Sequence, residues 1–194
     1  GGADRDGETE TAARRGLAGG GGNVDPPLGR TNLRGTAFAS ATTAGTSELV
    51  DVGGNGAVFW TIDGSTWTAA TPGVTTNLDA VQYRNGLFVA IGDMGTIVTS
   101  PDAVTWTARA SPTTNALTAL EGNGSGQVIA VGANGTILVS SDSMSWAAAN
   151  SGTTSNLYGI GFGNGRYVAV GGHGSMLTTT DGTTGPAIAP ATAG

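Results

Sequence analysis

The sequence has no cysteine, no lysine and a single histidine among its 194 residues. The missing cysteines exclude disulfides, thiol catalysis and cysteine-based metal sites. With no lysine and a net charge of −6, the chain has no basic surface of the kind that binds nucleic acid. No apolar run approaches the roughly 20 residues that a membrane-spanning helix needs, so we expect no membrane insertion.

Helix-forming residues are also scarce, whereas glycine is abundant, with 35 residues beside many Thr, Ala and Ser. This composition favours short strands joined by tight turns, and therefore an all-β fold. A chain of this length forms one domain or at most two. Because it begins at Gly1 and not at a methionine, we expect it to be processed or to be cut from something longer.

A seven-residue segment recurs about every 40 residues along the chain. It has a hydroxyl residue first, an aspartate third and a tryptophan seventh, although the last copy ends in Gly185 in place of tryptophan. The four copies span residues 61–67, 100–106, 140–146 and 179–185. Internal repeats of this length are typical of propellers and solenoids.

Each repeat contains four short apolar segments, separated by the Gly, Asn and Asp residues that tight hairpins require. The second segment, for example residues 88–91 or 128–131, is apolar on both faces, so both faces should be buried. Radially stacked sheets of four strands bury their inner strands in this way. The repeats therefore predict a β-propeller of four blades with four strands per blade, in preference to a solenoid, whose repeats usually carry fewer elements.

The repeats, over residues 31–185, resemble two known kinds of propeller sequence. The seven-residue segment resembles the Asp-box of bacterial-neuraminidase-type repeats, but has one residue fewer between Asp and Trp. The whole unit resembles the repeats of photosystem II assembly-factor-like propellers, and similar units occur in secreted bacterial proteins and in phage structural proteins. The resemblance implies a propeller fold, which by itself does not specify a function.

The repeated aspartates could be calcium ligands, catalytic carboxylates or structural groups. A catalytic acid is needed once and not in every repeat, so we expect each aspartate to accept backbone hydrogen bonds in its own turn. We expect the tryptophans to pack between blades. The residues of this structural motif are Asp63, Asp102, Asp142, Asp181, Trp67, Trp106 and Trp146.

No active site is evident in the repeats. His173 occupies a turn position that holds Asn or Met in the other copies, with no histidine or cysteine partner. The Gly-x-x-Gly turns lead into strands, whereas a phosphate-binding loop leads into a helix. A sialidase would need several converging arginines, but Arg34, Arg84, Arg109 and Arg166 do not share an equivalent position. We therefore predict no enzyme activity, no cofactor and no metal.

The loops that join successive blades are rich in Thr, Asn and Ser and are expected to lie at one end of the propeller. They could bind glycan through hydroxyl and amide groups, or they could be ordinary solvated turns. The candidate residues are Thr75, Thr76, Asn77, Thr113, Thr114, Asn115, Thr153, Thr154 and Asn156.

The two ends of the chain differ from the repeats. Residues 1–30 form a Gly-rich extended arm, and residues 186–194 form a C-terminal tail. Such an arm is ordered only when something holds it, so we expect it to bind a neighbouring subunit. Residues 24–27 could also complete the last blade and close a four-bladed ring. Alternatively, the chain is half of a larger ring that a second copy completes.

These observations favour a non-enzymatic structural or binding propeller in an extracellular assembly. The preferred hypothesis is a phage virion component such as a fibre, spike or decoration protein, located outside the cell or in the virion. The alternatives are a secreted lectin-like module that binds carbohydrate and an assembly factor that holds a protein partner transiently.

Overall fold

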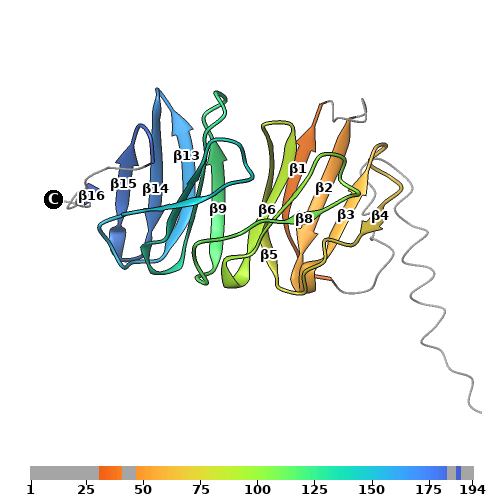
Figure 1. Ribbon diagram of the computed structural model, residues 1–194, viewed down its shortest axis with the longest axis horizontal. Coiled ribbons are helices and arrows are strands. Elements are labelled where there is room, and N and C mark those ends of the chain that lie inside the picture. The colour runs from red at the N-terminus through yellow and green to blue at the C-terminus, as the bar shows by residue number, and fades with distance from the viewer. Residues whose placement is uncertain (1–30, 41–46, 183–186, 189–194) are drawn as a thin grey trace, which may run out of the picture.

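The computed structural model describes residues 31–40, 47–182 and 187–188 (Figure 1). In these ranges the strands form four antiparallel sheets of four strands each, and every sheet comes from one repeat. This arrangement confirms the predicted all-β fold with four strands per blade. The sheets are called blades 1 to 4 in chain order.

Blade 1 contains β1 (Leu33–Ala39), β2 (Glu48–Gly53), β3 (Val58–Thr61) and β4 (Thr68–Ala70). Blade 2 contains β5 (Leu78–Arg84), β6 (Leu87–Gly92), β7 (Ile97–Ser100) and β8 (Thr107–Ala108). Blade 3 contains β9 (Leu117–Gly122), β10 (Val128–Gly132), β11 (Ile137–Ser140) and β12 (Ala147–Ala149). Blade 4 contains β13 (Leu157–Gly163), β14 (Arg166–Gly171), β15 (Met176–Thr179) and β16 (Ala187–Ile188).

A tight 3-10 turn joins the second and third strands of each blade. These turns are η1 (Gly54–Gly56), η2 (Asp93–Gly95), η3 (Ala133–Gly135) and η4 (Gly172–Gly174). In blade 2, a Cβ at Gly92 would lie 1.9 Å from the backbone oxygen of Asn77, and one at Gly95 would lie 2.0 Å from that of Thr113. The glycines of the Gly-x-x-Gly pattern are therefore required because another backbone approaches them closely.

The core lies between the blades and not inside any one of them. In blades 2 and 3, one face of the second strand packs on the following blade and the other face packs on the preceding blade. This explains why the second strand is apolar on both faces. The facing pairs are Val50 and Val52 with Phe88 and Ala90, then Val89 and Ile91 with Val128 and Ala130, then Ile129 and Val131 with Tyr167 and Ala169.

The first strands of successive blades lie next to one another in the order β1, β5, β9 and β13. Blades 1 and 4 lie at opposite ends of the molecule and extend to opposite sides (Figure 1). Within the described ranges these two blades do not pack on each other, so the ring is open. Each therefore has one face that no other described blade covers.

Blade 4 takes its fourth strand from residues 187–188, inside the segment expected to be a tail. The N-terminal arm, residues 1–30, was the other candidate for completing this blade, and it lies outside the described residues. In the part of the chain that is described, no helix has the length and apolar character to cross a membrane.

Candidate functional site

The aspartate of each seven-residue segment closes the turn after the third strand. In blade 2, Oδ1 of Asp102 accepts hydrogen bonds from the backbone N–H of Val104 at 3.0 Å and of Thr105 at 2.7 Å. It also accepts one from the hydroxyl of Ser100 at 3.1 Å. Asp63 and Asp142 make the same three bonds in their own blades. The carboxylates therefore stabilise the turns that follow the third strands.

The hydrogen bonds stabilise the charged form of these carboxylates. Backbone N–H donors, that of Ser145 foremost, lower the pKa of Asp142 to about 2. The backbone donors of Thr66 and Ser65 likewise lower the pKa of Asp63. In blade 4, Asp181 accepts a bond from the hydroxyl of Thr179 at 3.0 Å. Among the described residues, no three His, Asp or Glu side chains gather in a group that could hold a metal ion.

Two of the three tryptophans of the seven-residue segments, Trp106 and Trp146, pack where adjacent blades meet, as predicted. Trp106 lies against the core between blades 1 and 2, and its Nε1 donates to the backbone oxygen of Ala103 at 2.8 Å. Trp146 lies against the core between blades 2 and 3. The buried Nε1 atoms of Trp67 and Trp146 have no hydrogen-bond partner among the described residues.

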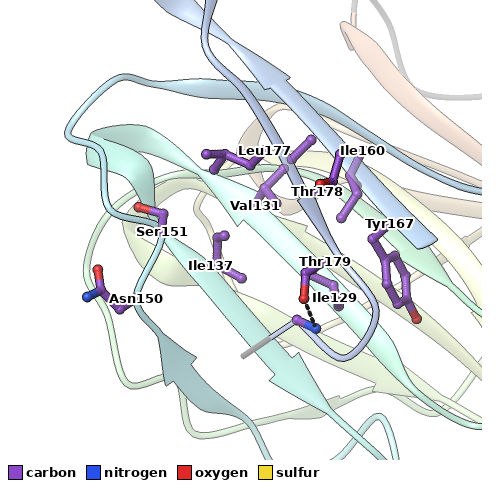
Figure 2. Close-up of a pocket in the computed structure, with 12 residues that line it drawn as sticks. Ile129, Val131, Ile137, Asn150, Ser151, Ile160, Tyr167, Leu177, Thr178 and Thr179 are labelled. Carbon is purple, nitrogen blue, oxygen red and sulfur yellow. Dashed lines mark hydrogen bonds between the residues drawn. The ribbon is translucent and has the colours of Figure 1, made fainter. Parts of the chain in front are cut away.

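The contact between blades 3 and 4 receives no tryptophan from the fourth repeat, because the sequence has Gly185 there. A cavity of ≈ 20 Å³ lies in this contact, and Figure 2 shows aliphatic side chains such as Ile129, Val131 and Leu177 around it. That volume holds about one water molecule. Ligand pockets are at least tenfold larger, about 300 Å³ or more, so this cavity is a packing defect.

Turns η1 to η4 place one exposed side chain each at the same end of their blades. These residues are Asn55, Met94, Asn134 and His173, and all four have a left-handed backbone, with φ between 54° and 57°. Asparagine tolerates this conformation, whereas most residues with a Cβ rarely adopt it. The same backbone geometry therefore presents an amide, a thioether and an imidazole side chain. Among the described residues, Met94 is the most exposed large apolar residue, at 70%.

The loops between blades pack against these turns. The backbone N–H groups of Asn55 and Asn134 donate to the side-chain oxygens of Asn77 and Asn156, at 3.0 and 2.9 Å. The glycine that ends η1, η2 or η3 lies against a backbone oxygen of the next loop. The turns and loops therefore form one continuous end of the molecule, which we call the turn end.

The structure divides the nine candidate loop residues into two groups. Six use their side chains in hydrogen bonds that hold the turn end together: Thr76, Asn77, Thr113, Asn115, Thr153 and Asn156. The other three, Thr75, Thr114 and Thr154, are exposed and make no side-chain hydrogen bond with the described residues. Only these three hydroxyl groups remain fully available to a ligand.

The arginines of the repeats do not converge on a common point. Arg34 pairs with Asp79 across blades 1 and 2, and Arg84 pairs with Glu121 across blades 2 and 3 at 2.9 Å. Nε of Arg109 donates to the hydroxyl of Thr99 in its own blade at 2.8 Å. The side chain of Arg166, in blade 4, has no hydrogen bond or ion pair with the described residues.

One surface was not predicted from the sequence. Residues 167–170 have the pattern of a strand buried on both faces, yet Val168 and Val170 are 36% and 44% exposed. Tyr167 and Ala169, which alternate with them, are buried against blade 3. The difference arises because no blade follows blade 4 in the described chain. The repeats placed Met94 at a turn position, but the sequence analysis did not single out this exposed methionine as a candidate site residue.

Fold and packing together define the class of this protein as a β-propeller. A family model, the DUF6242 beta propeller domain, matches residues 48–157, which is more than half of the chain. The chain belongs to this family. Among curated proteins, none matches the sequence.

Three solved structures show the same fold. "YCF48 bound to D1 peptide" is 18% identical, with a TM-score of 0.64 over 84% of this chain and 56% of that chain. The computationally designed Ika4 protein is 15% identical, with a TM-score of 0.65 over 83% and 99%. The designed Ika8 protein is 17% identical, with a TM-score of 0.64 over 82% and 49%. The chain thus spans little more than half of the YCF48 structure, and at these identities the likeness concerns the fold alone.

Proposed function

We propose that this chain is a non-enzymatic β-propeller that binds a segment of another protein through its turn end. The proposal rests mainly on the exposure and the backbone conformation of Met94. Its side chain is 70% exposed at the tip of η2, on a left-handed backbone that asparagine or glycine would adopt at lower cost. Backbone strain of this kind is concentrated at functional sites. Methionine is also enriched in protein interfaces, because its flexible side chain adapts to different partners.

The turn end has the rigidity that a binding surface needs. Its loops are held to the turns by the hydrogen bonds of Asn77 and Asn156, so little backbone would have to be ordered when a partner binds. Met94 and His173 project from this rigid surface with different chemistry on the same backbone. YCF48, which has a similar fold, has been solved bound to a D1 peptide. These observations support protein binding.

The proposal that the chain is not an enzyme rests on how its chemical groups are used. The carboxylates of Asp63, Asp102 and Asp142 accept backbone hydrogen bonds within their turns. His173 is exposed on a turn of the last blade. The expected behaviour is an absence of turnover on sialosides and other common glycosides. Turnover that an Asp102→Asn or Glu121→Gln variant abolishes would overturn this part of the proposal.

Two narrower hypotheses concern the setting. A role in a phage virion or another extracellular assembly is supported by the resemblance of the repeats, and detection of the chain in purified particles tests it. A lectin-like role is supported by the exposed hydroxyl groups of Thr75, Thr114 and Thr154. Glycan-array binding that is lost when these three threonines are changed to alanine would favour the lectin-like role.

The main experiment selects peptides from a displayed random library against the purified chain and measures their affinity for two matched variants. Met94→Ala removes the exposed side chain from the turn end. Met144→Ala removes another exposed methionine, from the Asp142 turn at the opposite end of its blade. Burial of one such side chain predicts a loss of about tenfold or more in affinity for Met94→Ala. Unchanged affinity, or an equal loss in Met144→Ala, would overturn the assignment of the turn end.

A further inference from the structure

The hairpin turns of blades 2 and 4 have the same sequence and the same backbone but different surroundings. The turn between β5 and β6 is Asn85-Gly86, with φ 55° and 75°, and the turn between β13 and β14 is Asn164-Gly165, with φ 50° and 72°. Asn-Gly is a preferred pair for tight two-residue hairpin turns. All four residues are exposed. Any difference in their chemistry must therefore come from neighbouring parts of the molecule.

Only the turn of blade 2 holds its asparagine side chain. Nδ2 of Asn85 donates to the backbone oxygen of Gly126 at 2.6 Å and to the hydroxyl of Ser143 at 2.9 Å, both in blade 3. No blade follows blade 4 in the described chain, and the side chain of Asn164 makes no hydrogen bond with the described residues. The carboxamide of Asn164 is therefore not held in one orientation.

The strand before the Asn164 turn is also weaker than its counterpart. β13 carries Gly159, Gly161 and Gly163 on the uncovered face of blade 4, whereas β5 contains no glycine. A Cβ at Gly161 or Gly163 would meet nothing within 4 Å, so no close approach of another backbone requires glycine there. Glycine in a strand costs conformational entropy and contributes no packing. We therefore expect the β13–β14 hairpin to open locally more often than the β5–β6 hairpin.

The other three Asn-Gly pairs of the sequence are protected. Oδ1 of Asn123 accepts two backbone hydrogen bonds, at 2.8 and 3.2 Å. Asn55 and Asn134 are followed by the buried Gly56 and Gly135, where a Cβ would lie 2.1 and 2.0 Å from a backbone oxygen of the next loop. Among the Asn-Gly pairs, only the one at 164–165 combines an unheld carboxamide with an exposed glycine.

We propose that Asn164 is a site of spontaneous deamidation. Asparagine is a thermolabile residue, and a following glycine hinders its own backbone nitrogen least. When the turn opens, the nitrogen of Gly165 attacks Cγ of Asn164 and passes its proton to the side-chain nitrogen, which leaves as ammonia. Water then opens the five-membered imide at either carbonyl and leaves aspartate or isoaspartate at position 164.

The modification changes the uncovered face of blade 4. It adds one negative charge two residues before Arg166, whose side chain has no ion pair with the described residues. Isoaspartate also lengthens the backbone of the turn by one atom, which should loosen the pairing of β13 with β14. This hairpin lies at the opposite end of blade 4 from η4, so the inference goes beyond peptide binding at the turn end.

The test incubates the full chain at mildly alkaline pH and follows each Asn-Gly pair by tandem mass spectrometry, with isoaspartate detected by enzymatic methylation. We expect Asn164 to react about tenfold or more faster than Asn85, because two hydrogen bonds of Asn85 must break before it reacts. In denaturant, where neither turn is formed, the two should react at similar rates. Asn164→Gln would have to close a larger ring and should remove the signal at this position alone.

A second variant tests the role of local opening. Gly161→Val places a better strand former in open space and should slow the reaction at Asn164 but not at Asn85. An unchanged rate at Asn164 in Gly161→Val would overturn the role assigned to the weak strand.

Three outcomes would overturn the assignment of the site. They are equal rates at Asn85 and Asn164 in the folded chain, a faster reaction at Asn55, and a reaction at Asn164 that occurs in denaturant only. None of these measurements involves a peptide ligand, so the binding proposed for Met94 can fail without changing them.

Discussion

The hydroxyl of Tyr167 donates a hydrogen bond to the backbone oxygen of Gln127 at 3.0 Å, and this bond ties β14 of blade 4 to the start of β10 in blade 3. Tyr167 is buried and occupies the position of Leu49, Phe88 and Val128 in the other blades. The ring of Tyr167 therefore packs in the core, and its hydroxyl group links blade 4 to blade 3.

Removal of this hydroxyl should destabilise the protein without altering the fold. Tyr167→Phe keeps the aromatic ring but removes one of two hydrogen bonds that the Gln127 oxygen accepts, the other coming from the backbone N–H of Asn123. The free energy of unfolding should therefore fall by about 0.5–1.5 kcal/mol. Urea denaturation measures the change. Tyr158→Phe is the control, since Tyr158 is exposed, and it should have no effect. A loss of the same size in both variants would contradict the assignment.

The same tyrosine should make stability fall at high pH. The pKa of Tyr167 is raised above the ordinary value of 10.0, and the largest cause of this shift is burial of the phenol. The unfolded chain therefore loses the phenolic proton first, and the contribution of Tyr167 is complete below pH 10 and is lost as pH rises through the folded pKa. Melting temperatures from pH 8 to pH 12 should fall more steeply for the natural chain than for Tyr167→Phe. Parallel curves would contradict this prediction.

The turn aspartates should contribute to stability and not to metal binding. Asp102→Ala removes the acceptor for two backbone N–H groups, and we expect a loss of about 1–2 kcal/mol in the free energy of unfolding. Asp102→Asn retains one oxygen acceptor and should lose less. Asp63→Ala should lower stability in the same direction, but less, because its turn is more exposed. A melting temperature that falls by several degrees when EDTA is added would show that the carboxylates hold a metal.

Acid should weaken the same turns. The pKa of Asp142 is about 2 in the folded chain, against an ordinary value of 3.8. A lowered pKa stabilises the fold above the unfolded value, and this stabilisation is lost as the pH falls from about 4 towards 2. Asp142→Asn cannot titrate, so its melting temperature should fall less between pH 5 and pH 2 than that of the natural chain. Calorimetry of the natural chain and of Asp142→Asn across this pH range tests the prediction. Equal falls in melting temperature for the two proteins would contradict it.

Met94 should show opposite effects on stability and on binding. Met94→Gly relieves the left-handed backbone of η2 and removes no buried contact, so the melting temperature should stay constant or rise slightly. Affinity for the selected peptides should fall as it does in Met94→Ala. Asn55→Gly is a stability control, because asparagine already tolerates this conformation. A clear loss of stability in Met94→Gly would mean that the side chain supports the turn.

Local chemistry determined most of what the sequence predicted. The spacing of Asp102 and Trp106, the glycines of Gly-x-x-Gly and the two-faced apolar strand at 88–91 each reflect contacts within a blade or between consecutive blades. Every repeat carries the same contacts, so their pattern specifies four strands per unit and a propeller. The structural role expected for the aspartates follows the same logic, since Ser100, Val104 and Thr105 are only two or three residues away from Asp102.

Only the tertiary structure decided which surfaces remain uncovered. Thr75 and Thr76 are neighbours of the same residue type, yet the hydroxyl of Thr76 is hydrogen-bonded to Thr96 and that of Thr75 faces solvent. Val170 has the sequence environment of the buried Val131, yet it is exposed. The exposure of Thr76 depends on a turn of the following strands, 20 residues away in the sequence, and that of Val170 depends on whether another blade covers it. Repeated local contacts encode the blade, whereas ring closure depends on the angle between blades, which no single repeat encodes.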